Sequence, residues 1–322
     1  MKGVVLTAFE GPDALAVREL PEPAAKEDQV LIDVEWAGVT FADLLQTRGE
    51  YQSRPQLPFI PGWEVSGTVR ADAGGFRAGD RVAAVSVTGG FARTVAVDAP
   101  MVFRLPENVD TRSGAALPLN YLTAHFALLR RGALRAGDVV LVHGAAGGVG
   151  SAACQVAAAY GARVIAVVSN EEKAELARSL GAHEVVAAGG FLDEVRTLTD
   201  GQGVDVVVDP VGGDRFLDSL RSLRRGVGRL LVLGFAGGGI PTVRVNRLLL
   251  TNTAVLGVGV AEYWRQDPQA ARAQWHELLP LLKSGRLDPP ISAVFPLEQA
   301  AAALRHLDER TALGRTLLIV RA

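Results

Sequence analysis

A glycine-rich stretch, DVVLVHGAAGGVG, carries the residues of this sequence that are best suited to bind a phosphorylated ligand. In this stretch, Asp138–Gly150, mostly β-branched apolar residues run directly into four glycines within seven positions, and a helical pattern begins at Ser151. This order predicts a strand, a tight turn and a helix start, where free backbone N–H groups and the helix dipole attract a pyrophosphate. Any larger residue in place of Gly147, Gly148 or Gly150 would hold that pyrophosphate away from the backbone with its side chain.

The glycine loop alone is weak evidence, because Ala145 stands where the usual dinucleotide fingerprint begins with glycine. The alternative is a glycine turn in some other α/β domain. However, a helix-compatible segment at Ser151–Tyr160 is ended by Gly161, and a second buried strand is predicted at Arg163–Val168. Together they form a βαβ unit of about 30 residues, which favours a dinucleotide. The residues expected to contact its pyrophosphate are Ala146, Gly147, Gly148 and Val149.

The residues at the end of the second strand discriminate between the two nicotinamide cofactors. A site for NAD usually has a carboxylate at this tip to hold the ribose 2′-OH, whereas a 2′-phosphate needs hydroxyl, amide and cationic partners. Here the tip carries Ser169 and Asn170, with Lys173 one helical turn further on. We therefore predict NADPH. The alternative is that Lys173 is an ordinary solvated lysine and that Glu171 and Glu172 are first-turn helix acids.

Composition and charge exclude several classes of protein. The chain has 322 residues, a formal net charge of −2 and no basic stripe, which argues against nucleic-acid binding. Its single cysteine, Cys154, lies in an apolar helical segment, so a disulfide or a cysteine-rich zinc site within one chain is excluded. The first residues, MKGVVLTAFEG, contain one lysine and an apolar run that is too short for a signal peptide, so we expect none, and no apolar run approaches the roughly 18 residues of a membrane helix. We expect a cytoplasmic protein that does not bind membranes.

The chain is long enough for two domains of about 150 residues each. Residues 1–117 contain short strands between proline and glycine turns, which predicts a compact β-rich domain. Residues 118–260 alternate strands with helices, which predicts a doubly wound parallel sheet with its ligand at the carboxyl ends of the strands. Gly234 and Phe235 fall at such an end. The tail, residues 261–322, is assigned back to the first domain because the sheet is already complete.

Six motifs occur in order along the chain: PFIPGWEVSGTV at Pro58–Val69, GDRVAA at Gly79–Ala84, GGFA at Gly89–Ala92, ALPLNYLTA at Ala116–Ala124, HGAAGGVG at His143–Gly150 and GRTLLIV at Gly314–Val320. Together they resemble the medium-chain dehydrogenase/reductase superfamily and, within it, the zinc-independent quinone oxidoreductase branch, the relatives of zeta-crystallin. The resemblance spans nearly the whole chain. It implies an α/β fold, with a Rossmann domain that binds NADPH beside a discontinuous GroES-like catalytic domain.

The resemblance also bears on metal binding. Zinc alcohol dehydrogenases of the superfamily carry a cysteine in the segment that matches Gly38–Asp43 and a histidine at the position of Trp63, and a second cysteine cluster holds a structural zinc. This chain has Val39 or Thr40 and Trp63 at those positions and no cluster. Because a catalytic zinc needs three N, S or O ligands, we expect no metal. Without a Lewis acid the acceptor must itself be electrophilic and needs hydrogen-bond donors at its developing oxyanion.

The family pattern places the candidate catalytic residues. The segment Val39–Tyr51 matches VNxxD followed by RxGxY, which lies near the nicotinamide and the substrate, with Thr40 in place of the usual Asn. Tyr51 is the expected oxyanion donor, and the alternative is a tyrosine that bridges the domains. Asp43 is either a polar orienter or a turn-stabilising residue at a helix start. Trp63 either lines the substrate site or belongs to the core.

Two further positions concern the cofactor. Thr123 matches a family threonine near the nicotinamide or the phosphates, and Arg315 matches the basic residue of the closing GK/GR motif. Family members often have a tyrosine after the third Rossmann strand, against the 2′-phosphate. Here that position is Ala187 or Ala188, which weakens the prediction of NADPH without reversing it.

These observations predict a reductase that transfers hydride from NADPH to a quinone without zinc. One alternative is an enoyl or 2-alkenal reductase, which acts on an α,β-unsaturated carbonyl, and another is a non-enzymatic NADPH-binding structural protein. We also expect a homodimer through the apolar edge strand Thr251–Val260. An edge with few charges invites pairing, and the superfamily's dimers pair this strand across a two-fold axis.

Overall fold

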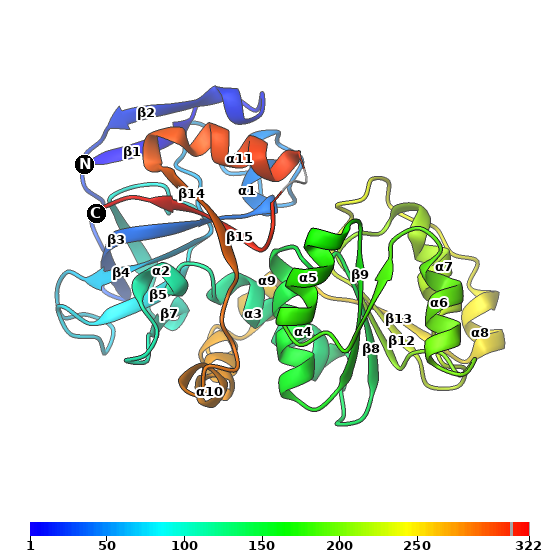
Figure 1. The fold of residues 1–322 in the computed structure, drawn as a ribbon. Coiled ribbons are helices and arrows are strands. Elements are labelled where there is room, and N and C mark those ends of the chain that lie inside the picture. The colour runs from blue at the N-terminus through cyan, green and yellow to red at the C-terminus, as the bar shows by residue number, and fades with distance from the viewer. Residues whose placement is uncertain (310–311, 322) are drawn as a thin grey trace. The chain divides into compact units, whose positions relative to one another are not determined.

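The computed structural model describes residues 1–309 and 312–321. The chain divides into two compact units, one formed by Met1–Leu119 with Asp267–Ala322 and the other by Asn120–Gln266 (Figure 1). The first unit is therefore discontinuous in sequence. The sequence alone placed the two boundaries near residues 117 and 260.

The second unit is built on a six-stranded parallel sheet with the strand order β10-β9-β8-β11-β12-β13. The inner strands β8, β9 and β11 are short, mostly apolar runs that are buried on both faces, as expected for a parallel sheet covered by helices, whereas the edge strands β10 and β13 are only partly buried. This arrangement confirms the predicted doubly wound sheet. The strands are β8 (Val139–His143), β9 (Arg163–Val168), β10 (Glu184–Ala187), β11 (Val206–Asp209), β12 (Arg229–Val232) and β13 (Ala254–Gly257).

Helices cover both faces of this sheet, with α4 and α5 on one face and α6, α7 and α8 on the other (Figure 1). Phe191 of α6 and Phe216 of α7 pack with Leu141 and Ile165 of the strands in one apolar core. The helical segments are α3 (Pro118–His125), a π-helical turn η3 (Phe126–Arg131), α4 (Gly148–Ala159), α5 (Glu171–Ser179), α6 (Phe191–Leu198), η4 (Gly213–Arg215), α7 (Phe216–Arg221), α8 (Asn246–Thr251) and α9 (Val260–Gln266).

Two sequence-based boundaries in this unit were wrong. The expected edge strand Thr251–Val260 is only β13, because Thr251 ends α8 and Val260 begins α9. Asn252 adopts a left-handed conformation with φ 51°, which ends α8 and turns the chain into the strand. Helix α4 begins at Gly148 rather than at Ser151, so two of the loop glycines belong to its first turn.

The first unit contains a seven-stranded sheet with the path β14-β15-β3-β4-β5-β7, and β6 pairs with β3. Strands β14 and β15 come from the C-terminal segment, and β15 pairs antiparallel with β3. The elements before the crossing are β1 (Lys2–Leu6), η1 (Pro12–Ala14), β2 (Leu15–Glu19), β3 (Gln29–Val39), α1 (Phe41–Thr47), β4 (Glu64–Val69), β5 (Arg81–Val85), β6 (Thr94–Asp98), η2 (Ala99–Met101), β7 (Val102–Arg104) and α2 (Thr111–Gly114). Those after it are α10 (Ala270–Lys283), β14 (Ile291–Pro296), η5 (Leu297–Gln299), α11 (Ala300–Asp308) and β15 (Arg315–Ile319).

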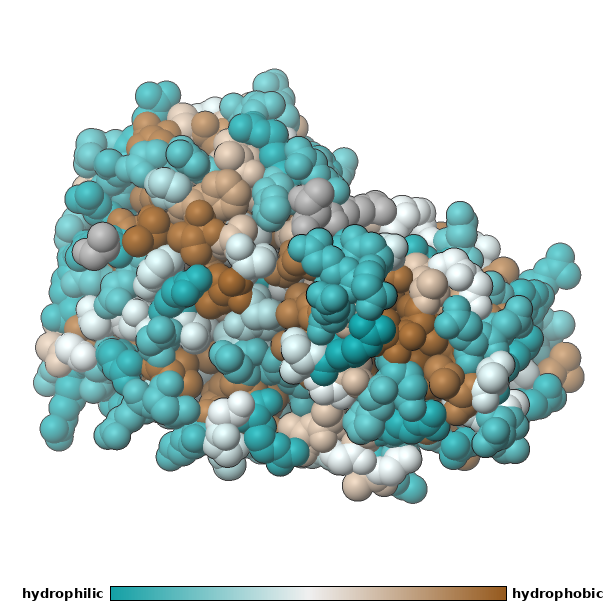
Figure 2. All heavy atoms as spheres, viewed as in Figure 1, coloured by the Kyte–Doolittle hydropathy of each residue, from teal (hydrophilic) through white to brown (hydrophobic). Residues whose placement is uncertain are grey.

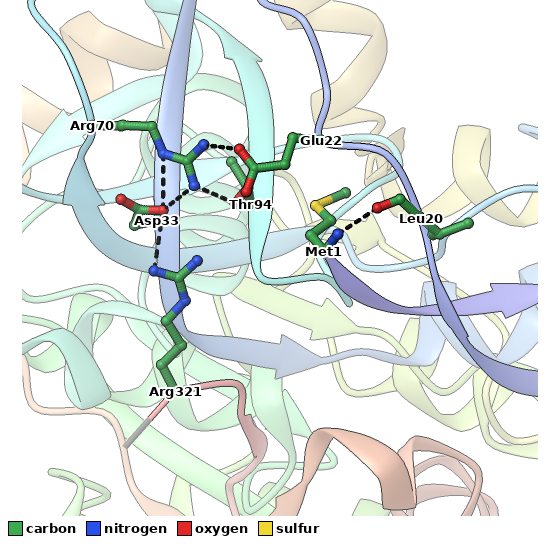
Figure 3. Close-up of polar contacts among 7 residues, drawn as sticks. All are labelled: Met1, Leu20, Glu22, Asp33, Arg70, Thr94 and Arg321. Carbon is green, nitrogen blue, oxygen red and sulfur yellow. Dashed lines mark hydrogen bonds and ion pairs between the residues drawn. The ribbon is translucent and has the colours of Figure 1, made fainter.

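A polar network joins the terminal segments of the first unit to its sheet (Figure 3). Arg70 donates to Asp33 through Nε at 3.1 Å and Nη2 at 2.6 Å, and Nη2 also donates to Thr94 at 2.8 Å. Glu22 pairs with the same guanidinium, and Arg321 reaches Asp33 at 3.2 Å. The network is partly exposed, so its ion pairs add little stability, and it connects Glu22 and Arg321 to strands β3 and β6.

Candidate dinucleotide and substrate sites

The glycine loop forms a tight turn between β8 and α4. Gly144 adopts φ +59°, Gly147 donates to the Gly144 carbonyl at 2.9 Å, and α4 then begins with Gly147 as its N-cap. The first N–H groups of a helix have no intrahelical partner, so the turn presents donors where the sequence predicted pyrophosphate contacts. The residues there are Ala146, Gly147, Gly148 and Val149.

Gly150 serves a different purpose from the one predicted. A Cβ at Gly150 would lie 2.0 Å from the Gly144 carbonyl oxygen and 2.9 Å from the Ala145 Cα. The missing side chain therefore lets α4 pack against its own preceding turn. The expectation that Gly150 keeps a slot open for the ligand is corrected to a packing requirement within the protein.

The tip of β9 brings together the residues predicted to hold a 2′-phosphate. Lys173 Nζ donates to Ser169 Oγ at 3.3 Å, so a hydroxyl and an ammonium lie side by side at the carboxyl end of the strand. Asn170 is the N-cap of α5, and its side-chain oxygen accepts from the Lys173 backbone N–H at 2.9 Å. The Asn170 side chain is thus primarily a helix cap that positions Lys173 one turn along.

Two neighbouring strand ends complete this edge of the sheet. After β11, Asp209 accepts from the backbone N–H groups of Val211 and Gly212 at 2.9 and 2.8 Å, which fixes that loop. After β12 come Gly234 and Phe235, and the Phe235 ring is 39% exposed. Because β9, β8, β11 and β12 are parallel neighbours, the loop, the Ser169 tip and Gly234 follow one another along a single edge.

His143, the last residue of β8, was not singled out from the sequence. It is fully buried, its Nε2 lies 2.8 Å from Ser219 Oγ, and its ring meets Phe191 edge to face. Ser219 donates its one hydroxyl proton to the Arg215 carbonyl at 2.9 Å, so the hydrogen between Ser219 and His143 belongs to Nε2. Burial lowers the pKa of His143 to about 4. The neutral ring links the start of the glycine loop to α7.

In the first unit, Thr40 and Asp43 form the start of α1. Thr40 N and Oγ1 donate to Asp43 Oδ2 at 2.9 and 2.6 Å, and the Asp43 backbone N–H donates back to Thr40 Oγ1 at 3.2 Å. This is a capping box, which matches the turn-stabilising alternative for Asp43. Asp43 Oδ1 also accepts from Gly62 N at 3.0 Å. Burial raises the pKa of Asp43 to about 6, against the opposing effect of the hydrogen bonds from Thr40 and Gly62.

Trp63 belongs to the core rather than to an open surface. It is 4% exposed, and its indole Nε1 donates to Gln46 Oε1 at 3.0 Å. The half-buried Tyr51 ring meets Trp63 edge to face with a centroid distance of 5.4 Å. Burial and the nearby charge of Asp43 raise the pKa of Tyr51, so its hydroxyl stays protonated near neutral pH. Gln46 was not singled out from the sequence.

Arg315 lies in the core of the first unit. It is 4% exposed and pairs with the fully buried Glu64, whose Oε2 also accepts from the Leu119 backbone N–H at 3.0 Å. Burial lowers the pKa of Arg315 to about 10, so the guanidinium remains charged near neutral pH. Arg315, which the sequence predicted to contact the cofactor, is therefore paired with a carboxylate inside the protein. Thr123, the other position carried over from the family, is half-buried on α3 in the second unit.

A surface hollow of about 520 Å³ lies away from these residues. It is formed by β10 and α6, and Figure 2 shows apolar residues in brown between α5 and α6, where β10 lies. Its polar lining consists mostly of the carboxylates of Glu184, Asp193 and Glu194, and it includes neither the glycine loop nor the Ser169 tip. The hollow therefore does not suit the dinucleotide.

In residues 1–309 and 312–321, no group of three or more His, Cys, Asp or Glu side chains is arranged to hold a metal ion. Within the same ranges, no helix combines the length and the apolar character that a membrane crossing requires.

Comparison with known proteins identifies the family. Residues 26–107 match the family model of the alcohol dehydrogenase GroES-like domain, and residues 148–284 match that of the zinc-binding dehydrogenases. Rat quinone oxidoreductase-like protein 2 is 39% identical over 98% of this chain and 91% of its own length, and human quinone oxidoreductase is 32% identical over 99% and 98%. The chain belongs to the medium-chain dehydrogenase/reductase superfamily and, within it, to the quinone oxidoreductases and their close homologues.

Solved structures agree with this assignment. The Thermus thermophilus quinone oxidoreductase, solved alone and with NADPH, is 38% identical and superposes with a TM-score of 0.88 over 99% of this chain and all of that one. The Escherichia coli quinone oxidoreductase in complex with NADPH is 28% identical with a TM-score of 0.91, over 99% of this chain and all of that one. The name of the second family model implies zinc, but the described residues do not offer a matching donor set.

Proposed function

We propose that this protein is an NADPH-dependent reductase that transfers hydride to a quinone without zinc. The observation that carries the proposal is the Ser169–Lys173 pair, at 3.3 Å, on the strand next to the glycine loop. A hydroxyl and an ammonium at this tip suit a 2′-phosphate, and no carboxylate occupies the tip itself. The NADPH complexes of the Thermus and Escherichia coli enzymes support the same cofactor.

The residues of the second unit would hold the cofactor by its charged groups. The backbone N–H groups at the start of α4 would bind the pyrophosphate, and Ser169 with Lys173 would bind the 2′-phosphate. NADPH, when bound, supplies the hydride. The protein's part is to orient the nicotinamide ring and to exclude water from it.

Tyr51 is the proposed donor to the oxygen on which negative charge develops. Its raised pKa keeps the hydroxyl protonated, and the edge-to-face contact with Trp63 restrains the ring. A donor fixed before the reaction stabilises the developing oxyanion more than a mobile one does, because no reorganisation is needed. A quinone or an enone is electrophilic enough to accept hydride with such help alone, whereas an alcohol would need a metal to stabilise its alkoxide.

A substrate panel tests the proposal. Purified protein would be assayed with benzoquinone, naphthoquinone, conjugated enones and simple alcohols, each with NADPH and with NADH. We expect turnover of quinones with NADPH and negligible oxidation of alcohols. A strong preference for enones over quinones would favour the enoyl or 2-alkenal reductase instead. NADPH binding without turnover of any acceptor would leave the structural protein as the function, and efficient alcohol oxidation would contradict the zinc-free mechanism.

We further propose a cytoplasmic homodimer that pairs through β13. Among the residues that the structure describes, this strand pairs on one side only, with β12, and its neighbourhood in sequence is rich in exposed apolar side chains. Leu249 and Leu250 of α8 are 79% and 69% exposed, and Ile240 and Val245 are exposed to a similar extent. Covering such side chains with a second copy removes them from water.

Sedimentation at micromolar concentration tests the dimer. Leu249→Lys combined with Leu250→Glu should shift it toward monomer without lowering the melting temperature of the monomer itself. Val87→Lys, an exposed apolar position in the first unit, is the control and should leave the dimer unchanged. A wild-type monomer at these concentrations would contradict the proposal that two copies pair through β13.

A further inference from the structure

Helix α1 holds two consecutive residues of the segment that precedes β4. Asp43 and Gln46 lie one turn apart on α1, so they face the same side. Asp43 Oδ1 accepts from the backbone N–H of Gly62 at 3.0 Å, and Gln46 Oε1 accepts from the indole of Trp63 at 3.0 Å. The backbone and the side chain of this segment are therefore fixed by one short helix.

The backbone around Trp63 is restrained on its other side as well. Gly62 adopts φ +111°, and a Cβ there would lie 2.6 Å from the Gly90 Cα. The Ser86 backbone N–H donates to the Trp63 carbonyl at 2.8 Å, and the Ser86 hydroxyl donates to the Gly62 carbonyl at 3.0 Å. With the backbone fixed in this way, the remaining freedom of Trp63 is the rotation of its side chain, which the bond to Gln46 restricts.

The Gln46 side chain is an unusual choice for stability. An indole N–H is only a donor, so the Gln46 oxygen must face Trp63 and the amide nitrogen must point away. That nitrogen is buried, and no residue in the described ranges accepts a hydrogen bond from it. A buried donor without a partner destabilises a protein, so the hydrogen bond to Trp63 is formed at the cost of an unpaired amide N–H.

The contact from Trp63 to Tyr51 gives this arrangement a purpose. The two rings meet edge to face at an interplanar angle of 75°, a geometry that aromatic pairs favour. A rotated Trp63 ring would lose this contact, and Tyr51 would lose the surface that restrains it. We propose that Gln46 is a positioning residue, which holds the Trp63 ring and through it the hydroxyl of Tyr51. This inference rests on the proposed role of Tyr51 as the donor to the acceptor's oxygen.

The test compares Gln46→Met, which removes the hydrogen bond at nearly constant volume, with wild type. Loss of one ordinary hydrogen bond corresponds to about a fivefold change, so kcat with naphthoquinone should fall by about fivefold. KM for NADPH should be unchanged. The melting temperature should fall only slightly, because the substitution removes the unpaired amide of Gln46 but leaves the indole N–H of Trp63 unpaired in its place. Trp63→Phe, which deletes the indole N–H, should give a similar loss, and adding Gln46→Met to it should cause no further loss.

The Tyr51→Phe background separates positioning from a general structural effect. If Gln46 acts through Tyr51, Gln46→Met should change kcat little once the hydroxyl is gone. The matched control is Thr47→Val, which removes another buried polar group of α1 that bonds only locally, to the Leu44 carbonyl, and should leave kcat unchanged. An unchanged kcat in Gln46→Met, or an equal loss in both backgrounds, would overturn the inference. If Tyr51→Phe itself keeps full activity, it is the role of Tyr51 that fails.

Discussion

Cofactor preference offers the sharpest test of the strand-tip assignment. Lys173 Nζ lies 3.3 Å from Ser169 Oγ, so both groups can bind the oxygens of one phosphate without a change in the backbone. Lys173→Ala would remove the cation and leave the hydroxyl. A charge-assisted hydrogen bond contributes about 1.5–3 kcal/mol. Because the pair is near the surface, we take the lower end, about 1.5 kcal/mol, which corresponds to about a tenfold weaker binding of NADPH.

The binding of NADH should hardly change in this variant, because NADH has no phosphate at the 2′ position. Both dissociation constants can be measured by nicotinamide fluorescence from about 50 mM to about 500 mM salt, and the wild-type preference for NADPH should shrink as salt screens the ion pair. Lys283→Ala is the control, since it removes one positive charge from the exposed end of α10 in the first unit, rather than from the unit that carries the strand tip. Equal losses for NADPH and NADH would refute the reasoning and make Lys173 a structural residue.

Three further predictions concern the metal, the donor and a buried histidine. Purified protein should contain no stoichiometric zinc and keep its activity in the presence of a chelator. One equivalent of zinc that is lost together with activity would contradict the expectation that this chain lacks the zinc ligands. Tyr51→Phe should lower kcat and kcat/KM together, while an effect on KM alone would reduce Tyr51 to a binding surface. For His143, burial lowers the pKa from its usual 6.5 to about 4, so its stabilising contribution is fully present above pH 6.5 and is lost as the pH falls from there through about 4. The full shift corresponds to about 3 kcal/mol. In urea titrations, His143→Gln, which can still donate to Ser219, should therefore lose less stability than wild type over this range, and an identical pH dependence in both proteins would argue against the buried neutral imidazole.

The features that the sequence predicted well depend on local patterns. The run from Val139 into the glycine loop combines a buried strand with a turn and a helix start, and each part is encoded within a few residues. Ser169 and Lys173 are four residues apart on either side of the Asn170 N-cap, so the local turn into α5 brings them together. The capping box of Thr40 and Asp43 has the same local character, which is why the turn-stabilising alternative could be stated for Asp43 from the sequence.

The residues that the sequence did not indicate act through contacts between distant segments. The role of Gln46 depends on its hydrogen bond with Trp63. The tautomer of His143 is set by its hydrogen bond with Ser219, which lies 76 residues further along the chain. Nothing in the local sequence distinguishes such side chains from ordinary core residues. The role of Gly150 was misassigned for a related reason, because a close approach between a helix and its preceding turn follows from their packing and not from the residue type.

The pairing of Glu64 with Arg315 gives a physical reason for the return of the chain to its first unit. Glu64 on β4 accepts the backbone N–H of Leu119, in the first turn of α3, the helix on which the chain leaves that unit. A fully buried carboxylate is costly unless a cation neutralises it, and the cation is supplied by β15, near the end of the chain. The carboxylate of Glu64 therefore holds the start of α3, and its negative charge is neutralised only after the C-terminal strands have joined the sheet. Replacement of Arg315 alone would leave Glu64 unpaired in the core, whereas replacement of both by apolar residues would remove the charge but also the acceptor for Leu119.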